Sequence, residues 1–180
     1  MSLNPEMMGP QGGLDGGLDG ALDGGLDGAL ASAVLSRGHT RLTLAGARLM
    51  LEAAEAKARA MGKPMDIAIC DDGSNLLAFH RMDGARITSI DVAMSKAFTA
   101  AAARVPTSTY GQLAAPGQPA FGIHVRNHGK FMIVAGGLPI QVQGEFLGGI
   151  GCSSGTPAED TLVAQAGIDA LLSLVSPAGA

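Results

Sequence analysis

Two short apolar runs separated by a tight turn set the strongest limit on the fold. The runs are MDIAICD (65–71) and LLAFHRMD (76–83), and the turn is DGSN (72–75). Glycine and asparagine supply the backbone geometry that such a turn needs. A connection this short joins antiparallel neighbours, because parallel strands need a crossover of a dozen or more residues. The pattern therefore predicts a β-hairpin in an antiparallel sheet.

Further strand-like runs follow in the second half of the chain. They are FGIHVR (121–126), KFMIVAG (130–136), LPIQVQ (138–143) and, as an additional candidate, FLGGIGCS (146–153). Their connections are again short and contain glycine. We expect one antiparallel sheet of about five strands.

Three helices are predicted around these strands. Residues 43–61 carry apolar side chains at helical spacing. Residues 89–105 are rich in alanine, with Ser89 as a potential cap, and Pro106 follows them. Thr156-Pro157-Ala158-Glu159 has the form of a capping box and begins a helix that reaches about Leu174. The order α-ββ-α-βββ-α, with a possible fourth strand in the second group, predicts an α+β fold in which helices pack on the sheet.

The N-terminal part of this 180-residue chain differs in composition. Residues 12–30 read GGLDGGLDGALDGGLDGAL, with leucine and aspartate each at a four-residue period. The glycines oppose helix formation, so we expect a low-complexity tail over 1–36, with a helix docked on a partner subunit as the alternative. Residues 37–180 are expected to form a single domain.

The acidic charge of the chain belongs to this tail. The formal net charge is −4, yet five acidic residues precede the first basic residue, Arg37. The rest, with 12 basic and 11 acidic residues, carries a formal charge of +1. A nearly neutral domain with 3% aromatic residues argues against nucleic-acid binding.

The sequence also contains features that indicate the cellular location of the protein. No apolar run approaches the roughly 20 residues needed to cross a bilayer, and no secretory signal is visible. Cys70 and Cys152 lie in apolar stretches without a metal-binding or disulfide spacing, so we expect buried, reduced thiols. These features favour a cytoplasmic protein.

The end of the predicted hairpin carries His80, Arg81 and Asp83. Strand alternation places His80 on one face and Arg81 with Asp83 on the other. The Arg–Asp pair could hold an anionic ligand, or it could simply fix the following turn.

The alanine-rich helix carries Lys96, Thr99 and Arg104. A partly buried lysine among small residues could bind a carboxylate or work as an acid–base group. The alternative is an exposed lysine that only contributes to solubility.

Two other motifs have features of ligand sites. His124 and His128 have metal-ligand spacing for a helix, but on a strand four residues span about 13 Å, which argues against one shared metal. The glycine-rich residues 148–155 precede a helix N-terminus, where an oxyanion or carboxylate could bind. Glu159 and Asp160 in the first turn would oppose a phosphate there.

A set of short motifs together resembles the GlcG/HbpS family, also called haem-degrading or DUF336, which includes the C-terminal domain of PduO-type proteins. The motifs are DDG (71–73), RMDGA (81–85), SKAFTA (95–100), PT (106–107), FGI (121–123), GG (136–137), PI (139–140) and GGIG (148–151). The resemblance covers about residues 40–175 and excludes the acidic tail. It implies an antiparallel sheet flanked by helices and a homo-oligomer.

The same resemblance implies two kinds of function. Some members of the family bind haem, and others are hydroxylaminobenzoate lyases that release ammonia. His39 is the nearest analogue of an N-terminal histidine ligand in a PduO-type domain. Gly136 and Gly137 match family glycines and are expected to contact the ligand.

Three hypotheses follow. In the first, the chain binds haem or a related anionic ligand: Lys96 and Arg104 pair with propionates, and His39, His80 or His124 offers the axial nitrogen. In the second, the chain is a cofactor-independent lyase or isomerase acting on a small aromatic acid such as 4-hydroxylaminobenzoate. A third hypothesis is a non-catalytic assembly protein with the tail as its interaction element.

In the lyase hypothesis, a cation and an acid–base group act together on the substrate. The substrate carboxylate is bound by Arg81, Lys96 or Arg104. The acid–base group is His80, His124 or Asp83.

Overall fold

The structure is a computed structural model that describes residues 39–175. The chain divides into a unit of residues 1–39 and a unit of residues 40–180, and every helix and strand described below lies in the second. The strands are β1 (Asp66–Cys70), β2 (Leu76–Arg81), β3 (Gly137–Val142) and β4 (Glu145–Ser153). The α-helices are α2 (Leu44–Ala60), α3 (Ser89–Ala103), α4 (Thr107–Leu113) and α5 (Pro157–Val175).

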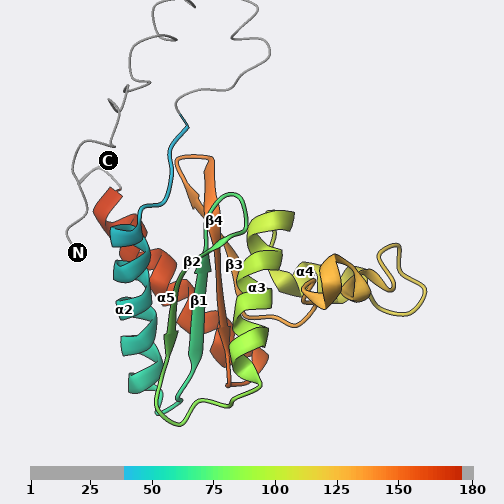
Figure 1. Ribbon diagram of the computed structural model, residues 1–180, viewed down its shortest axis with the longest axis horizontal. Coiled ribbons are helices and arrows are strands. Elements are labelled where there is room, and N and C mark those ends of the chain that lie inside the picture. Colours follow the sequence, from blue (N-terminus) through green and yellow to red (C-terminus); the bar gives the residue numbers. More distant parts are fainter. Residues whose placement is uncertain (1–38, 176–180) are drawn as a thin grey trace, which may run out of the picture. The chain divides into compact units, whose positions relative to one another are not determined.

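The four strands form an antiparallel sheet in the order β2-β1-β4-β3. Helices α2 and α5 cover one face, and α3 covers the other (Figure 1). Ile67 and Ile69 of β1 join the core beneath α2 and α5, whereas Ala68 and Cys70 pack with the alanines of α3. This alternation follows from the two-residue period of a strand buried on both faces. The predicted α+β fold with an antiparallel sheet is confirmed.

Helix α3 packs directly on the backbone of β4. A Cβ added to Gly149 would lie 2.6 Å from the backbone nitrogen of Ala101, and one added to Gly151 would lie 2.8 Å from the Cβ of Lys96. Such distances are too short for a real side chain. The small alanines of α3 and the glycines of β4 therefore allow the helix and the strand to pack closely.

The local signals at the helix ends are largely confirmed. Thr43 caps α2 by accepting a hydrogen bond from the backbone nitrogen of Gly46 at 3.2 Å. The capping box of α5 is formed, since the Thr156 nitrogen donates to Glu159 Oε2 at 2.8 Å and the Glu159 nitrogen donates to Thr156 Oγ1 at 3.3 Å. The expected cap at Ser89 is wrong, because Ser89 is the first helical residue and Thr88 occupies the cap position without a side-chain bond.

The strand prediction is correct for the runs at 138–143 and 146–153, and wrong for those at 121–126 and 130–136. The latter segments contain two 3₁₀ turns, η2 (Ile123–Val125) and η3 (Asn127–Gly129), and irregular chain. Inside the first run, Gly122 has a φ angle of +84° and Ile123–Val125 form a 3₁₀ turn, so this run is not extended. The described chain therefore has four strands instead of about five.

We call residues 115–130 the arm, because this segment extends away from the sheet beyond α4 (Figure 1). It contains both 3₁₀ turns. The chain returns from the arm at Phe131, whose ring packs edge-on against Tyr110 of α4 with 4.6 Å between centroids.

The predicted tail over 1–36 lies outside the described residues. Within residues 39–175, no helix has the length and apolar character that crossing a membrane requires.

Candidate functional site

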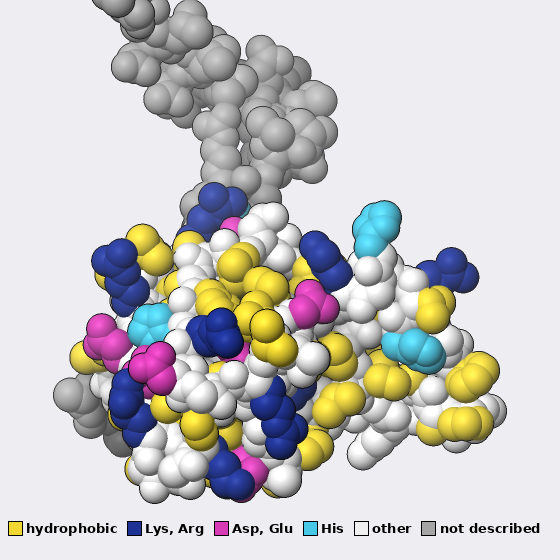
Figure 2. All heavy atoms as spheres, turned by 60° about the horizontal axis from the view of Figure 1, so that its bottom comes forward, with side chains coloured by type: hydrophobic (Ala, Val, Ile, Leu, Met, Phe, Trp, Pro, Cys, Tyr) yellow, Lys and Arg dark blue, Asp and Glu magenta, His cyan; other side chains and the backbone are white. Residues whose placement is uncertain are grey.

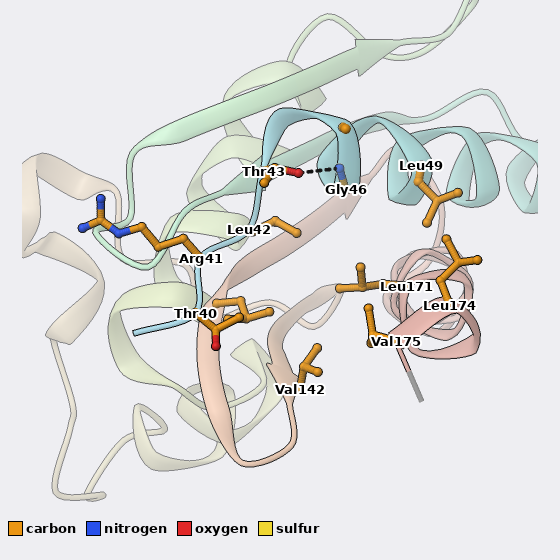
Figure 3. Close-up of a pocket in the computed structure, with 12 residues that line it drawn as sticks. Thr40, Arg41, Leu42, Thr43, Gly46, Leu49, Val142, Leu171, Leu174 and Val175 are labelled. Atoms are coloured by element: carbon orange, nitrogen blue, oxygen red, sulfur yellow. Dashed lines mark hydrogen bonds between the residues drawn. The ribbon is translucent and has the colours of Figure 1, made fainter. Parts of the chain in front are cut away.

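An open, apolar pocket lies between the start of α2, the C-terminal end of α5 and the β3–β4 hairpin (Figure 3). Its volume is about 410 Å³. Leu49 of α2 and Leu174 of α5 face each other across it (Figure 3). The lining residues are Thr40, Arg41, Leu42, Thr43, Ala45, Gly46, Leu49, Val142, Leu147, Leu171, Leu174 and Val175.

Hydrogen bonds fix the wall of the pocket that precedes α2. The backbone nitrogen of Thr40 donates to Glu145 Oε2 at 3.1 Å, which ties this segment to the β3–β4 turn. The cap at Thr43 then sets the direction in which α2 begins. Gly46 leaves room for Leu42, since a Cβ there would lie 3.0 Å from a Leu42 methyl carbon. The wall is therefore built by local sequence, and the bond between Thr40 and Glu145 ties it to a distant part of the chain.

Arg41 brings positive charge to the rim of the pocket. Its side chain extends away from the apolar residues (Figure 3), and its Nε lies 3.9 Å from Asp72 Oδ2. Arg41 and Leu42 also line a second recess with Asp71, Asp72 and the rest of the hairpin turn. An exposed ion pair at this distance is weak, so the guanidinium can exchange its partner for a ligand anion.

The lining of the pocket suits an apolar ligand, and Arg41 at its rim offers a cation for an acidic group. Ligand sites combine a mainly apolar lining with a few polar groups that fix orientation. The described residues contain no cluster of three or more His, Cys, Asp or Glu side chains that could hold a metal ion.

Lys96, a predicted site residue, lies in the interior. It is 1% exposed, and its Nζ donates to Asp160 Oδ2 at 2.7 Å and to the carbonyl oxygen of Cys152 at 2.8 Å. Asp160 Oδ1 accepts from the backbone nitrogen of Gly155 at 2.9 Å. These contacts favour a structural role for Lys96, which ties α3 to β4 and α5.

Gly136 and Gly137 pack around this ion pair. A Cβ on Gly136 would lie 2.8 Å from Lys96 Nζ, and a Cβ on Gly137 would lie 2.6 Å from the Lys96 carbonyl oxygen. The nitrogen of Gly137 donates to Thr107 Oγ1 at 3.0 Å. The structure thus accounts for both glycines by close packing, without invoking a ligand.

Thr99 and Arg104 occupy other positions on the α3 side. Thr99 is buried; its Oγ1 accepts from the Met132 nitrogen at 2.8 Å and donates to the Lys130 oxygen at 3.2 Å. It therefore fastens the returning end of the arm. Arg104 is exposed at the C-cap of α3, with its guanidinium carbon 5.1 Å from the centre of the Phe146 ring.

His80 lies on the other face of the sheet, where its Nδ1 is 2.8 Å from Glu55 Oε2 of α2. The hydrogen bond from Arg59 lowers the pKa of Glu55, and the bond with His80 acts in the same direction, against the effect of burial. Arg81 and Asp83 are exposed at the end of β2 and just after it. The expected separation of His80 from Arg81 by strand alternation agrees with this arrangement.

The remaining histidines lie apart from these groups. His124 is exposed in η2 of the arm, on a 3₁₀ turn instead of the strand that we expected. His39 is exposed and directly precedes Thr40 in the sequence. The predicted candidates are therefore spread over several places: Lys96, Gly136 and Gly137 come together, and the others do not.

Two buried carboxylates escaped the sequence reasoning. The sequence presents Asp160 as an acid in the first turn of a helix, and the signal for its structural role is a lysine in an alanine-rich helix, which needs an acidic partner when it is buried. Asp66 is fully buried, and neither of its carboxylate oxygens has a hydrogen-bond partner. Burial raises the pKa of Asp66, and the nearby charge of Arg81 partly opposes that effect. No sequence signal distinguished Asp66 from a strand-terminal acid.

Both cysteines are buried free thiols, as expected. Burial raises the pKa of Cys70 to about 12, and it raises the pKa of Cys152 as well. Neither group is set up as a thiolate nucleophile.

The fold and the pocket together define a small α+β domain. An apolar recess of a size that suits a small ligand lies on the face of the sheet that α2 and α5 cover. A family model described as haem-degrading protein, HbpS-like, matches residues 42–169. The chain belongs to this HbpS-like family, and the resemblance to the GlcG/HbpS group is confirmed.

Individual relatives agree with this assignment. A 15.0 kDa protein from the dhaT-dhaS intergenic region of Citrobacter freundii is 37% identical over 128 residues, which cover 71% of this chain and 90% of that protein. The crystal structure of ORFY from Klebsiella pneumoniae, a DUF336 protein, has a TM-score of 0.74 and 32% identity, covering 76% of this chain and 94% of that one. The crystal structure of a PduOC–haem complex has a TM-score of 0.70 and 27% identity, covering 73% of this chain and 95% of that one.

Proposed function

We propose that this chain binds haem or a closely related tetrapyrrole. The observation that carries the proposal is the pocket of about 410 Å³ lined almost entirely by apolar side chains, in a chain of the HbpS-like family. The solved PduOC–haem complex, whose fold the chain shares, supports the same ligand class. The pocket fits the group by its lining and by the cation at its rim.

The residues that would hold the macrocycle come from α2, α5 and the segment that precedes α2. Leu49, Leu171 and Leu174 offer apolar surface, and Arg41 offers a guanidinium for a propionate. Arg41 takes the propionate-binding role that the sequence suggested for Lys96, because the Lys96 ammonium group is already hydrogen-bonded inside the domain. We retain His39 as the proposed iron ligand. Bound haem would supply a redox-active iron, while the protein would bind, orient and shield it.

Titration of the full chain with hemin, followed at the Soret band, tests the proposal. Leu174→Glu should raise the Kd about tenfold or more, because it places a carboxylate against the apolar macrocycle. Leu162→Glu is the matched control, since Leu162 is an exposed leucine of the same helix that does not line the pocket. Equal effects of the two variants, or no Soret shift with the unaltered chain, would overturn the proposed site.

Separate variants test Arg41 at the rim of the pocket and His39 as the iron ligand. Arg41→Ala should weaken binding, whereas Asp72→Asn should strengthen it slightly, because it removes a competing carboxylate. His39→Ala should change the Soret position, and His128→Ala should not.

The lyase alternative receives no support from the comparisons. Its candidate residues do not converge either: His80 contacts α2, Arg81 belongs to the opposite face of β2, and His124 lies in the arm. It is not proposed further.

A further inference from the structure

The arm has an unusual charge composition. Between Asp91 and Glu145 the sequence contains no acidic residue. The arm itself contains His124, Arg126, His128 and Lys130. Within residues 39–175, none of these four side chains makes an ion pair with a carboxylate, and the Nζ of Lys130 lies 6.0 Å from the centre of the Phe98 ring.

Apolar side chains accompany these basic groups. Phe121 and Val125 are each 65% exposed. The right-hand lobe in Figure 2, where the arm lies, shows hydrophobic, histidine and basic side chains and no visible acidic side chain. Exposed apolar groups rimmed by charge of one sign are typical of a surface that binds a partner.

One segment of this same chain has the complementary composition. Residues 12–30 contain five leucines and four aspartates, and the rest are glycine and alanine. The segment contains no basic residue. The leucines of this segment can therefore pack against Phe121 and Val125, and its aspartates can form ion pairs with Arg126 and Lys130.

We propose that the arm binds residues 12–30 of a second copy of this chain. The chain enters the domain at Thr40, which is bonded to Glu145 at the β3–β4 turn, whereas the arm extends from the α3 side of the sheet (Figure 1). The entry point at Thr40 and the arm thus lie on different parts of the described domain. Because each copy supplies both an arm and a repeat, reciprocal exchange gives a closed dimer, whereas head-to-tail exchange gives a ring or an open filament. The inference is independent of haem.

Photo-crosslinking of the full chain tests the contact. Benzoylphenylalanine replaces Phe121, and equal amounts of ¹⁵N-labelled and unlabelled chains are mixed, irradiated and digested. We expect crosslinks from position 121 to residues 12–30 in peptides of mixed isotope content. The same probe at Leu162, an exposed position on α5, should not give them. Crosslinks confined to one isotope, or to another segment, would overturn the proposal.

Charge exchange provides the second test. Arg126→Glu with Lys130→Glu should lower the crosslink yield about threefold to tenfold, as expected for two exposed ion pairs. Mixing this variant with chains carrying Asp19→Lys and Asp23→Lys should restore the yield. Restoration depends on complementary charge, so loss of folding cannot imitate it. Failure to restore, or displacement of the crosslink by oligonucleotide or anionic vesicles in preference to free 12–30 peptide, would contradict the assignment.

Discussion

The ammonium group of Lys96 lies 2.7 Å from Asp160 Oδ2 in the interior of the domain, where the two side chains are 1% and 4% exposed. This pair connects the middle of α3 to the first turn of α5, and a second hydrogen bond from Lys96 reaches the Cys152 carbonyl oxygen of β4. Removing one partner of such a pair leaves a buried charge without compensation.

Lys96→Met should therefore lower the free energy of unfolding by about 3–5 kcal/mol. The double variant Lys96→Met, Asp160→Leu should lose less than the sum of its single variants, because no isolated charge remains. Urea denaturation measures all three. Lys57→Met on the exposed part of α2 is the control and should change little; a similarly small change for Lys96→Met would show that the pair is not structural.

Gly136→Ala should destabilise the domain through the same cluster. The new methyl group would lie 2.6 Å from Asp160 Cβ, in a residue whose φ is +114°. Gly117→Ala serves as control, since φ there is +82° with nothing near the added Cβ. The control should cost about 1–2 kcal/mol for the left-handed backbone alone. Thermal denaturation should show a clearly larger loss for Gly136→Ala, and equal losses would contradict the packing argument.

Thr99→Val should loosen the returning end of the arm. The substitution keeps the shape of the side chain but removes the acceptor of the Met132 amide and the donor to the Lys130 oxygen. We expect a loss of about 1–3 kcal/mol, since buried polar groups are left unpaired. Hydrogen exchange should accelerate at Met132, while the amides of β1 keep their protection. Unchanged exchange at Met132 would exclude this role for Thr99.

Asp66→Asn should make the stability less dependent on pH. Burial raises the pKa of Asp66 in the folded chain, so the protonated form favours folding, and stability falls as the pH rises from the unfolded value of about 4 through the folded value. The Asn variant avoids that loss. Its free energy of unfolding should exceed that of the unaltered chain at pH 7 and approach it near pH 3. A constant difference across this range would show that the carboxyl group does not titrate as inferred.

The parts of the fold that the sequence predicted are those with local causes. The hairpin depends on the turn at 72–75, and the start of α5 depends on hydrogen bonds between Thr156 and Glu159, three residues apart. The strand predictions for 121–126 and 130–136 are wrong because the composition of both runs suits strands, whereas Ile123–Val125 form a 3₁₀ turn and neither run pairs with a strand of the described sheet.

The candidate site depended on contacts between distant residues. The sequence indicates that Lys96 is unusual in its helix, but its partner Asp160 lies 64 positions away, and no local pattern links the two residues. The pocket is assembled from the starts and ends of separate elements, such as Leu42 before α2 and Val175 at the end of α5. Because several separate segments form this cavity, a pattern within one of them cannot predict it.

The direct contact of α3 with the glycines of β4 has a consequence for where a ligand can enter. Where α3 crosses these glycines, the helix lies almost on the backbone of the strand, so no side-chain layer separates the two elements there and a ligand cannot enter without parting them. On the opposite face a recess of about 410 Å³ remains where α2 begins, and leucines of α2 and α5 line it. Substitution of those leucines can therefore change the shape of this recess without altering the contact between α3 and β4.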